Sequence, residues 1–264
     1  MTGRIQDKVV IVTGAGSVGP GWGNGKASAV TYAREGAKVF CVDRNEEAAA
    51  ETRGIIESEG FAVVAHTCDV ADEAQVETMV AACREAYGRV DVLHNNVGIA
   101  GLGGPVETTL ADWRRVMDVN VTSMFLTCKH MIPLFLAQGG GAIVNISSLS
   151  AVKAIRPELA YAASKGAVNS LTINIAMAYA DRNIRCNAIL PGLMETPMVK
   201  AFQGGGAPGE VEAVMATRHA LSPTGRMGEG WDVAHAAVYL ASDEARYVNG
   251  VLFYVDAGLQ YRVG

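Results

Sequence analysis

Short runs of apolar and β-branched residues alternate with longer amphipathic stretches along the whole chain. The runs predict seven strands, at Lys8–Gly14, Ala37–Asp43, Ala62–Val70, Val90–Gly98, Gly141–Ser148, Ile184–Gly192 and Val251–Gly258. The stretches between them predict helices, for example at Glu46–Ser58, Glu73–Ala86 and Thr109–Leu136. Strands that are almost continuously apolar are typical of a parallel sheet buried on both faces. The pattern therefore predicts an α/β fold, doubly wound, with a seven-stranded parallel sheet and helices on both faces.

The alternation runs without a break, which predicts one domain spanning residues 1–264, with no linker and no internal repeat. Two segments rich in glycine, Ile99–Pro105 and Ala201–Glu210, are expected to be flexible. The second lies after the sixth predicted strand, and it makes residues 197–225 a candidate lid over a substrate.

The composition narrows the class of protein. Half of the 264 residues are hydrophobic and the net charge is −5, which indicates a soluble globular protein and gives no reason to expect nucleic acid or membrane as a partner. No apolar stretch reaches the roughly 18 residues of a membrane span. No signal peptide precedes the first strand, so a cytoplasmic location is expected. The five cysteines and five histidines lack metal-ligand spacing, so no metal site is expected.

A glycine-rich stretch follows the first predicted strand and contains a literal G-x-G-x-x-G at Gly14, Gly16 and Gly19. A dinucleotide-binding turn needs a helix whose N-terminus faces the pyrophosphate. A helix beginning near Gly16 would have to include Pro20, at a cost of about 3 kcal/mol relative to alanine, and several glycines at about 1 kcal/mol each. The literal triplet is therefore not expected to be the phosphate site.

A helix without proline begins only near Asn24, with the sequence NGKASAVTYARE. This places Gly14 at the end of the strand, and Gly23 and Gly25 at the start of the helix. The second predicted strand ends in Asp43, whose carboxylate is suited to the two ribose hydroxyls of NAD and would repel the 2′-phosphate of NADP. We therefore favour NAD, although Arg44 could reach a phosphate.

The stretch "TG…GNGKASAVTYAREGAKV" resembles the TGxxxGxGxAxAxxxAxxGAxV pattern of the short-chain dehydrogenase/reductase family, whose fold is a Rossmann domain. The similarity extends from Lys8 to Gly258 and includes NNVG, VMDVNV, LPGLMET and VDAG. The departure is an inserted turn of about five residues, Val18–Trp22. We expect it to form a lip over the cofactor, with Trp22 against the neighbouring loop.

The resemblance implies a set of cofactor-binding residues at the ends of the strands. They are Gly14, Ser17, Gly23, Asn24, Gly25, Asp43, Arg44, Asp69, Val70, Asn96, Val97, Gly98, Tyr161, Lys165, Pro191, Gly192, Leu193 and Thr196.

The family's catalytic signature is matched by Ser148, Tyr161 and Lys165, and Asn120 falls at the family's helix asparagine. Tyr161 and Lys165 are four residues apart, so on a helix they share one face. Tyrosine has an ordinary pKa of about 10, and a nearby ammonium lowers it toward the range of a general base. We expect Tyr161 to move the proton, Lys165 to favour the phenolate, and Ser148 to orient the substrate oxygen. The resemblance implies that Asn120 holds a water linking Lys165 to solvent.

These residues indicate interconversion of a secondary alcohol and a ketone by an NAD-dependent oxidoreductase. The expected substrate-contacting residues are Ser148, Ser150, Ile155, Tyr161 and Met194, and the mostly apolar pocket suggests a cyclic or aromatic substrate. The lengthened first turn leaves an enoyl-thioester reductase open, and the fold alone leaves a non-catalytic NAD sensor open. The resemblance also implies a homodimer or homotetramer packed through the stretches Thr109–Leu136 and Tyr161–Ala180.

Overall fold

The computed structural model describes residues 3–154, 157–203 and 210–263. Its strands form one parallel seven-stranded sheet in the order β3-β2-β1-β4-β5-β6-β7, which confirms the predicted α/β fold class. The strands are β1 Val9–Thr13, β2 Lys38–Asp43, β3 Val63–Thr67, β4 Val92–Asn95, β5 Gly141–Ile146, β6 Ile184–Pro191 and β7 Leu252–Val255.

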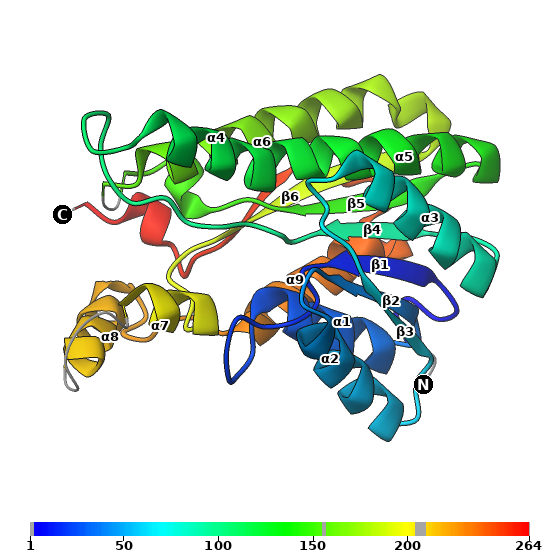
Figure 1. Cartoon of the computed structure of the whole chain (residues 1–264), viewed down its shortest axis with the longest axis horizontal. Coiled ribbons are helices and arrows are strands. Elements are labelled where there is room, and N and C mark those ends of the chain that lie inside the picture. Colours follow the sequence, from blue (N-terminus) through cyan, green and yellow to red (C-terminus); the bar gives the residue numbers. More distant parts are fainter. Residues whose placement is uncertain (1–2, 155–156, 204–209, 264) are drawn as a thin grey trace.

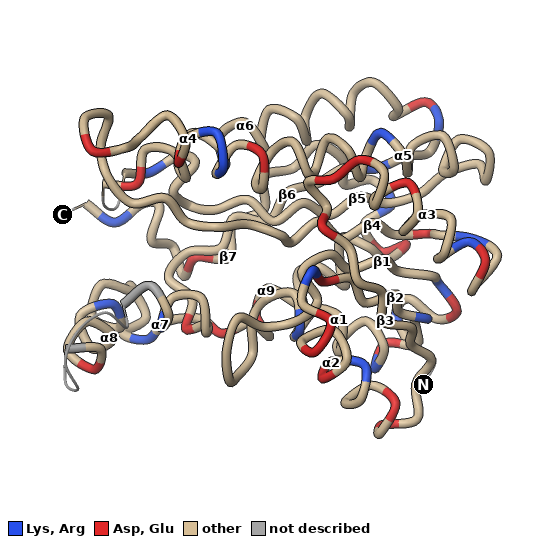
Figure 2. The backbone as a smooth tube through the Cα atoms, viewed as in Figure 1, with Lys and Arg blue, Asp and Glu red and all other residues tan. Residues whose placement is uncertain are grey.

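Helices cover both faces of this sheet, with α1, α2 and α9 on one side and α3, α4, α5 and α6 on the other (Figure 1). Their bounds are α1 Asn24–Arg34, α2 Glu46–Ser58, α3 Glu73–Tyr87, α4 Leu110–Met117, α5 Ser123–Gln138, α6 Leu159–Ala178, α7 Pro197–Gln203, α8 Glu210–Leu221 and α9 Gly230–Ala241. Charged residues of both signs are distributed over the helices and loops, and the strands carry few of them (Figure 2).

The helix expected over Thr109–Leu136 is divided in the structure. A π-helical turn at Asp118–Thr122 separates α4 from α5. The whole run Leu110–Gln138 is long and apolar enough to cross a membrane by length and composition alone, which corrects the expectation that no apolar stretch reaches the length of a span. Half of its apolar window is buried within the protein, and Met131 and Phe135 pack in the core beneath the sheet. The core helix of a soluble protein passes the same criterion, so the run is weak evidence for a membrane.

A buried polar network ties the helices of this face to the centre of the sheet. Asn95 of β4 donates from Nδ2 to Asn145 Oδ1 of β5 at 2.9 Å. Thr127 of α5 donates to Asn95 Oδ1 at 2.8 Å, and Asn145 donates to Thr172 Oγ1 of α6 at 2.9 Å. Because buried polar groups are costly unless they are paired, these contacts hold α5 and α6 in one register on the sheet. That register positions the residues of α6 described below.

Candidate active site

A cavity of about 480 Å³ opens beyond the carboxyl ends of the central strands, where doubly wound sheets bind ligands. It brings together all of the residues expected from the sequence to hold a cofactor. These are Gly14, Ser17, Gly23, Asn24, Gly25, Asp43, Arg44, Asp69, Val70, Asn96, Val97, Gly98, Tyr161, Lys165, Pro191, Gly192, Leu193 and Thr196. Residues distant in the chain therefore form one continuous wall.

The glycine-rich turn is built as its sequence predicted. The first helix begins at Asn24, with Gly23 as its N-cap residue. Gly14 has a φ of 65°, a conformation that favours glycine. A Cβ on Gly25 would lie 1.9 Å from the Gly14 carbonyl oxygen, so only glycine lets helix and turn approach so closely. The N-terminus of α1 thus faces the cavity with its unpaired backbone N–H groups, which is an arrangement suited to a phosphate.

The inserted turn is attached to helix α9, and this corrects the expectation that Trp22 packs against a neighbouring loop. The Trp22 and Trp231 rings lie 4.5 Å apart between centroids, and Lys26 Nζ lies 5.0 Å from the Trp22 ring centroid. At the other end of the turn, Val18 is 73% exposed and lines the cavity. The insertion is therefore anchored through Trp22, and Val18 at its other end is exposed at the cavity.

The Asp43 carboxylate lies at the mouth of this turn. Its Oδ2 accepts a hydrogen bond from the Gly16 backbone N–H at 3.0 Å, and its Oδ1 accepts one from the Asn45 N–H at 3.0 Å. An ionised carboxylate accepts several hydrogen bonds at once, so these contacts orient Asp43 and leave it suited to ribose hydroxyls. Arg44 is exposed and also lines the cavity.

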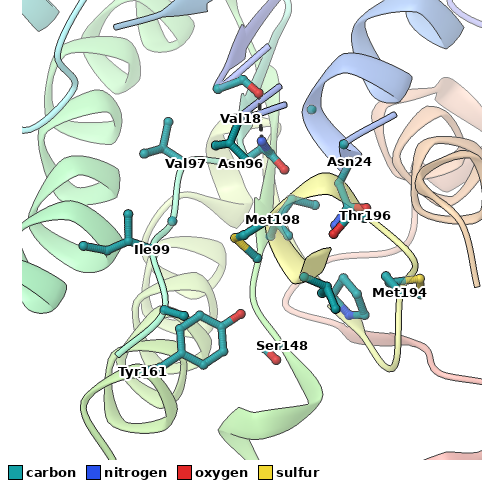
Figure 3. A pocket seen from close by; sticks show the side chains of 18 of the residues that line it. Val18, Asn24, Asn96, Val97, Ile99, Ser148, Tyr161, Met194, Thr196 and Met198 are labelled. Atoms are coloured by element: carbon teal, nitrogen blue, oxygen red, sulfur yellow. Dashed lines mark hydrogen bonds between the residues drawn. The ribbon is translucent and has the colours of Figure 1, made fainter. Parts of the chain in front are cut away.

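Three side chains of the proposed catalytic group meet on the opposite part of the wall. Ser148 follows β5, whereas Tyr161 and Lys165 lie one turn apart on α6. Tyr161 and Ser148 both extend toward the cavity, and Met194, Thr196 and Met198 approach it from another side (Figure 3). Lys165 Nζ donates to the Ile146 carbonyl at 2.8 Å and lies 5.7 Å from the Tyr161 ring centroid. The ammonium is thus held between the strand end and the tyrosine.

Burial lowers the pKa of Lys165 to about 8, because its ammonium is removed from water. Most Lys165 side chains are therefore still protonated at neutral pH. Gly98 leaves room for this ammonium, because a Cβ added there would lie 3.1 Å from Lys165 Nζ, which is tighter than most Cβ contacts. A buried cation beside a phenol and a serine hydroxyl is an arrangement that can move a proton on and off an oxygen atom.

Asn120 lies in the π-helical turn Asp118–Thr122 and is fully buried. Its Oδ1 accepts from the Ile99 N–H at 2.7 Å, and its Nδ2 donates to the Ile99 carbonyl and to Ser164 Oγ, both at 2.9 Å. The side chain thus fixes the loop that follows β4. Single π-helical turns inside α-helices are often found at functional sites.

The substrate end of the cavity contains Ser148, Ser150, Tyr161 and Met194 as expected, and Ile155 lies outside the described residues. Sequence reasoning missed Glu158, which lines the same cavity. Glu158 stands three residues before Tyr161, so helical periodicity could have identified it. Met198 and Arg218 also line the cavity and fall within the segment 197–225 that was expected to cover the substrate, although neither was named individually.

The residues present suit a nicotinamide dinucleotide. A Cβ added at Gly14, Gly16 or Gly25 of the first turn would come within 3.0 Å of a neighbouring atom, the Asp43 carboxylate suits a ribose, and Thr196 lines the same cavity. Among the described residues no group of three or more His, Cys, Asp or Glu side chains could hold a metal ion.

Comparison with known proteins shows which family this chain is similar to. The family model described as "Enoyl-(Acyl carrier protein) reductase" matches residues 20–260. The chain is 37% identical to levodione reductase of Leifsonia aquatica over 260 residues, covering 97% of this chain and 96% of that protein. It is 34% identical to cyclohexanol dehydrogenase of Acinetobacter sp. (strain SE19), covering 97% and 96%.

A solved structure from Burkholderia xenovorans, described as a short-chain dehydrogenase/reductase, superposes with a TM-score of 0.96 at 44% identity, covering 99% of this chain and 100% of that one. The relatives named above are oxidoreductases of the same family, and they match this chain over nearly its full length. The chain therefore belongs to the short-chain dehydrogenase/reductase family.

Proposed function

We propose that this protein is an NAD-dependent oxidoreductase that interconverts a secondary alcohol and a ketone on a largely hydrophobic, cyclic substrate. The observation that carries the proposal is the meeting of Ser148, Tyr161 and Lys165 on one wall of a cavity whose other end has a phosphate-binding turn. The names of two relatives, a levodione reductase and a cyclohexanol dehydrogenase, support a cyclic substrate.

In this proposal each side chain has a distinct task. Tyr161 takes the hydroxyl proton at its phenolic oxygen in oxidation and returns it in reduction. The Lys165 ammonium favours the phenolate by its charge, and Ser148 donates a hydrogen bond that orients the reacting oxygen. When bound, NAD supplies the hydride acceptor. Asp43 and the first turn select NAD over NADP, and Asn120 supports the loop beside Lys165.

We further propose that the chain acts as one domain with residues 197–225 as its lid, in the cytoplasm, and as a homodimer or homotetramer. Met215 and Val199 of this segment belong to or pack against a small apolar cluster, whose other buried members are Leu149, Leu193, Met227 and Leu259. Such a cluster is small enough to open and close on binding.

The test is NADH formation by the purified protein over a panel of cyclic, aromatic and steroidal secondary alcohols, with Tyr161→Phe in parallel. We expect turnover that the substitution lowers at least a hundredfold while NADH still binds. Turnover that survives the substitution would contradict the role given to Tyr161.

A second candidate is an enoyl-thioester reductase, favoured by the lengthened first turn and by the description of the matching family model. Oxidation of NADH by a crotonyl thioester, in the absence of alcohol oxidation, would favour it. The intact spacing of Ser148, Tyr161 and Lys165 favours the carbonyl reaction. A non-catalytic sensor would bind NAD tightly without turning over any member of either panel.

A further inference from the structure

A buried glutamate, Glu158, is among the residues that line the cavity. Glu158 is 5% exposed, lines the cavity, and is the residue from which α6 begins, three positions before Tyr161. Backbone hydrogen bonds on both sides of it hold this position, because Gly103 N–H donates to Pro157 O and Leu159 N–H donates to Gly103 O, each at 3.0 Å. The carboxylate is therefore placed by the fold.

Glu158 is linked to Ser148 through a single residue. The Ser150 hydroxyl donates to Glu158 Oε1, and the Ser150 backbone N–H donates to Ser148 Oγ at 3.1 Å. Ser148, Ser150 and Glu158 thus form one polar strip that runs away from the proposed reacting oxygen.

The Glu158 side chain does not cap helix α6. Glu158 stands where N-cap side chains accept hydrogen bonds, yet its side chain makes no cap hydrogen bond to α6. The helix N-terminus still favours its negative charge. The same cavity is also lined by the apolar side chains of Leu149, Met194 and Met198.

We propose that Glu158, supported by Ser150, accepts a hydrogen bond from a second hydroxyl group on the substrate. The preferred substrates are then cyclic diols and the corresponding hydroxyketones, in which one carbinol reacts and the other is recognised. A hydroxyl suits the site because a carboxylate oxygen accepts hydrogen bonds and a hydroxyl group donates one. This inference rests on the proposed function and names its substrate class.

The experiment compares NAD-dependent oxidation of cyclohexanol, cis- and trans-cyclohexane-1,2-diol, cyclohexane-1,4-diol and 2-aminocyclohexanol. The readout is the ratio of kcat/KM for each bifunctional alcohol to that for cyclohexanol. Glu158→Gln removes the charge at nearly constant volume, and Ser150→Ala removes the supporting hydroxyl. Glu77→Gln, an exposed position on α3, is the matched control.

We expect at least one diol to be favoured over cyclohexanol, and Glu158→Gln to lower that ratio by about 10- to 100-fold, as befits a hydrogen bond to a charged group. Ser150→Ala should lower it in the same direction, and it keeps the test available should Glu158→Gln not fold. Glu77→Gln should leave the ratio unchanged.

Equal ratios in the wild-type protein and in Glu158→Gln, with cyclohexanol still oxidised, would overturn this inference and leave the proposed function standing. A clear preference for 2-aminocyclohexanol would overturn the hydroxyl in favour of an ammonium group. No oxidation of any alcohol by the wild-type protein would instead overturn the proposed function itself.

Discussion

The Lys165 ammonium lies 5.7 Å from the centroid of the Tyr161 ring and donates to the Ile146 carbonyl at 2.8 Å. The carboxyl end of β5 thus positions the Lys165 ammonium near the tyrosine ring. A positive charge at this distance favours the ionised form of the phenol.

Lys165→Met should therefore lower kcat/KM for alcohol oxidation by about 10²- to 10⁴-fold, the range of general acid–base effects. It should also move the rise of activity with pH to higher pH, because the phenol loses its cation. The measurement is the pH profile of kcat/KM. Lys129→Met, on the exposed face of α5, is the control, and a pH profile equal to that of wild type in Lys165→Met would contradict the role of the lysine.

Asp43→Ser should change the cofactor preference. The carboxylate would no longer repel a 2′-phosphate, and the exposed Arg44 would be left to attract one. We expect the ratio of kcat/KM for NADP to that for NAD to rise about a hundredfold. Glu47→Gln on α2 serves as a control for the loss of one nearby negative charge, and an unchanged ratio in Asp43→Ser would refute the assignment.

Deleting Val18–Trp22 should weaken NAD binding by about tenfold, because the turn over the cofactor loses its anchor on Trp231. Trp22→Ala should act in the same direction, whereas Trp22→Phe keeps a ring in place and should bind close to normally. Titration of the protein with NADH, followed by fluorescence, gives the Kd. Equal affinity in the deletion variant would show that the turn has no part in binding.

Exposed apolar side chains on α5 and α6 predict self-association. Phe125 is 51% exposed and Met177 is 74% exposed, and each lies on a helix whose other face is buried against the sheet. Native mass spectrometry should show a dimer or tetramer, and the double substitution of both residues by glutamate should give a smaller species. Arg84→Glu on α3 is the charge-change control. A wild-type monomer would contradict the prediction.

The buried pair Tyr32–His94 predicts a pH dependence of stability. The Tyr32 hydroxyl and His94 Nδ1 lie 3.0 Å apart, and burial lowers the pKa of His94 to about 3. The unfolded chain binds the proton below about pH 6.5. Since the unfolded state then binds more protons, the free energy of unfolding falls as the pH falls.

From pH 8 to pH 5 this residue should cost about 2 kcal/mol of unfolding free energy, measurable by urea denaturation. The double substitution Tyr32→Phe with His94→Val removes the titration without leaving the phenol unpaired, and its stability should fall less over the same range. An equal fall in both proteins would assign the effect to other groups.

Much of the architecture follows from local sequence patterns and could therefore be predicted from the sequence. The alternation of apolar strands and amphipathic helices is set by the periodicity of neighbouring residues. The start of α1 at Asn24 followed from the cost of Pro20 and the glycines inside a helix. The grouping of Ser148, Tyr161 and Lys165 was predicted from the resemblance to the family's catalytic signature, and the spacing of four residues placed the tyrosine and the lysine on one helix face.

The tertiary structure alone decided how distant segments contact one another. Nothing near Trp22 in the sequence indicates Trp231 as its partner, and the predicted lid 197–225 did not indicate which of its residues, such as Arg218, line the cavity. Glu158 could be placed on the face of Tyr161, but its burial and its bond to Ser150 depend on the loop that carries Gly103. Contacts of this kind arise from the packing of whole elements, and local sequence patterns record only which face of an element is apolar.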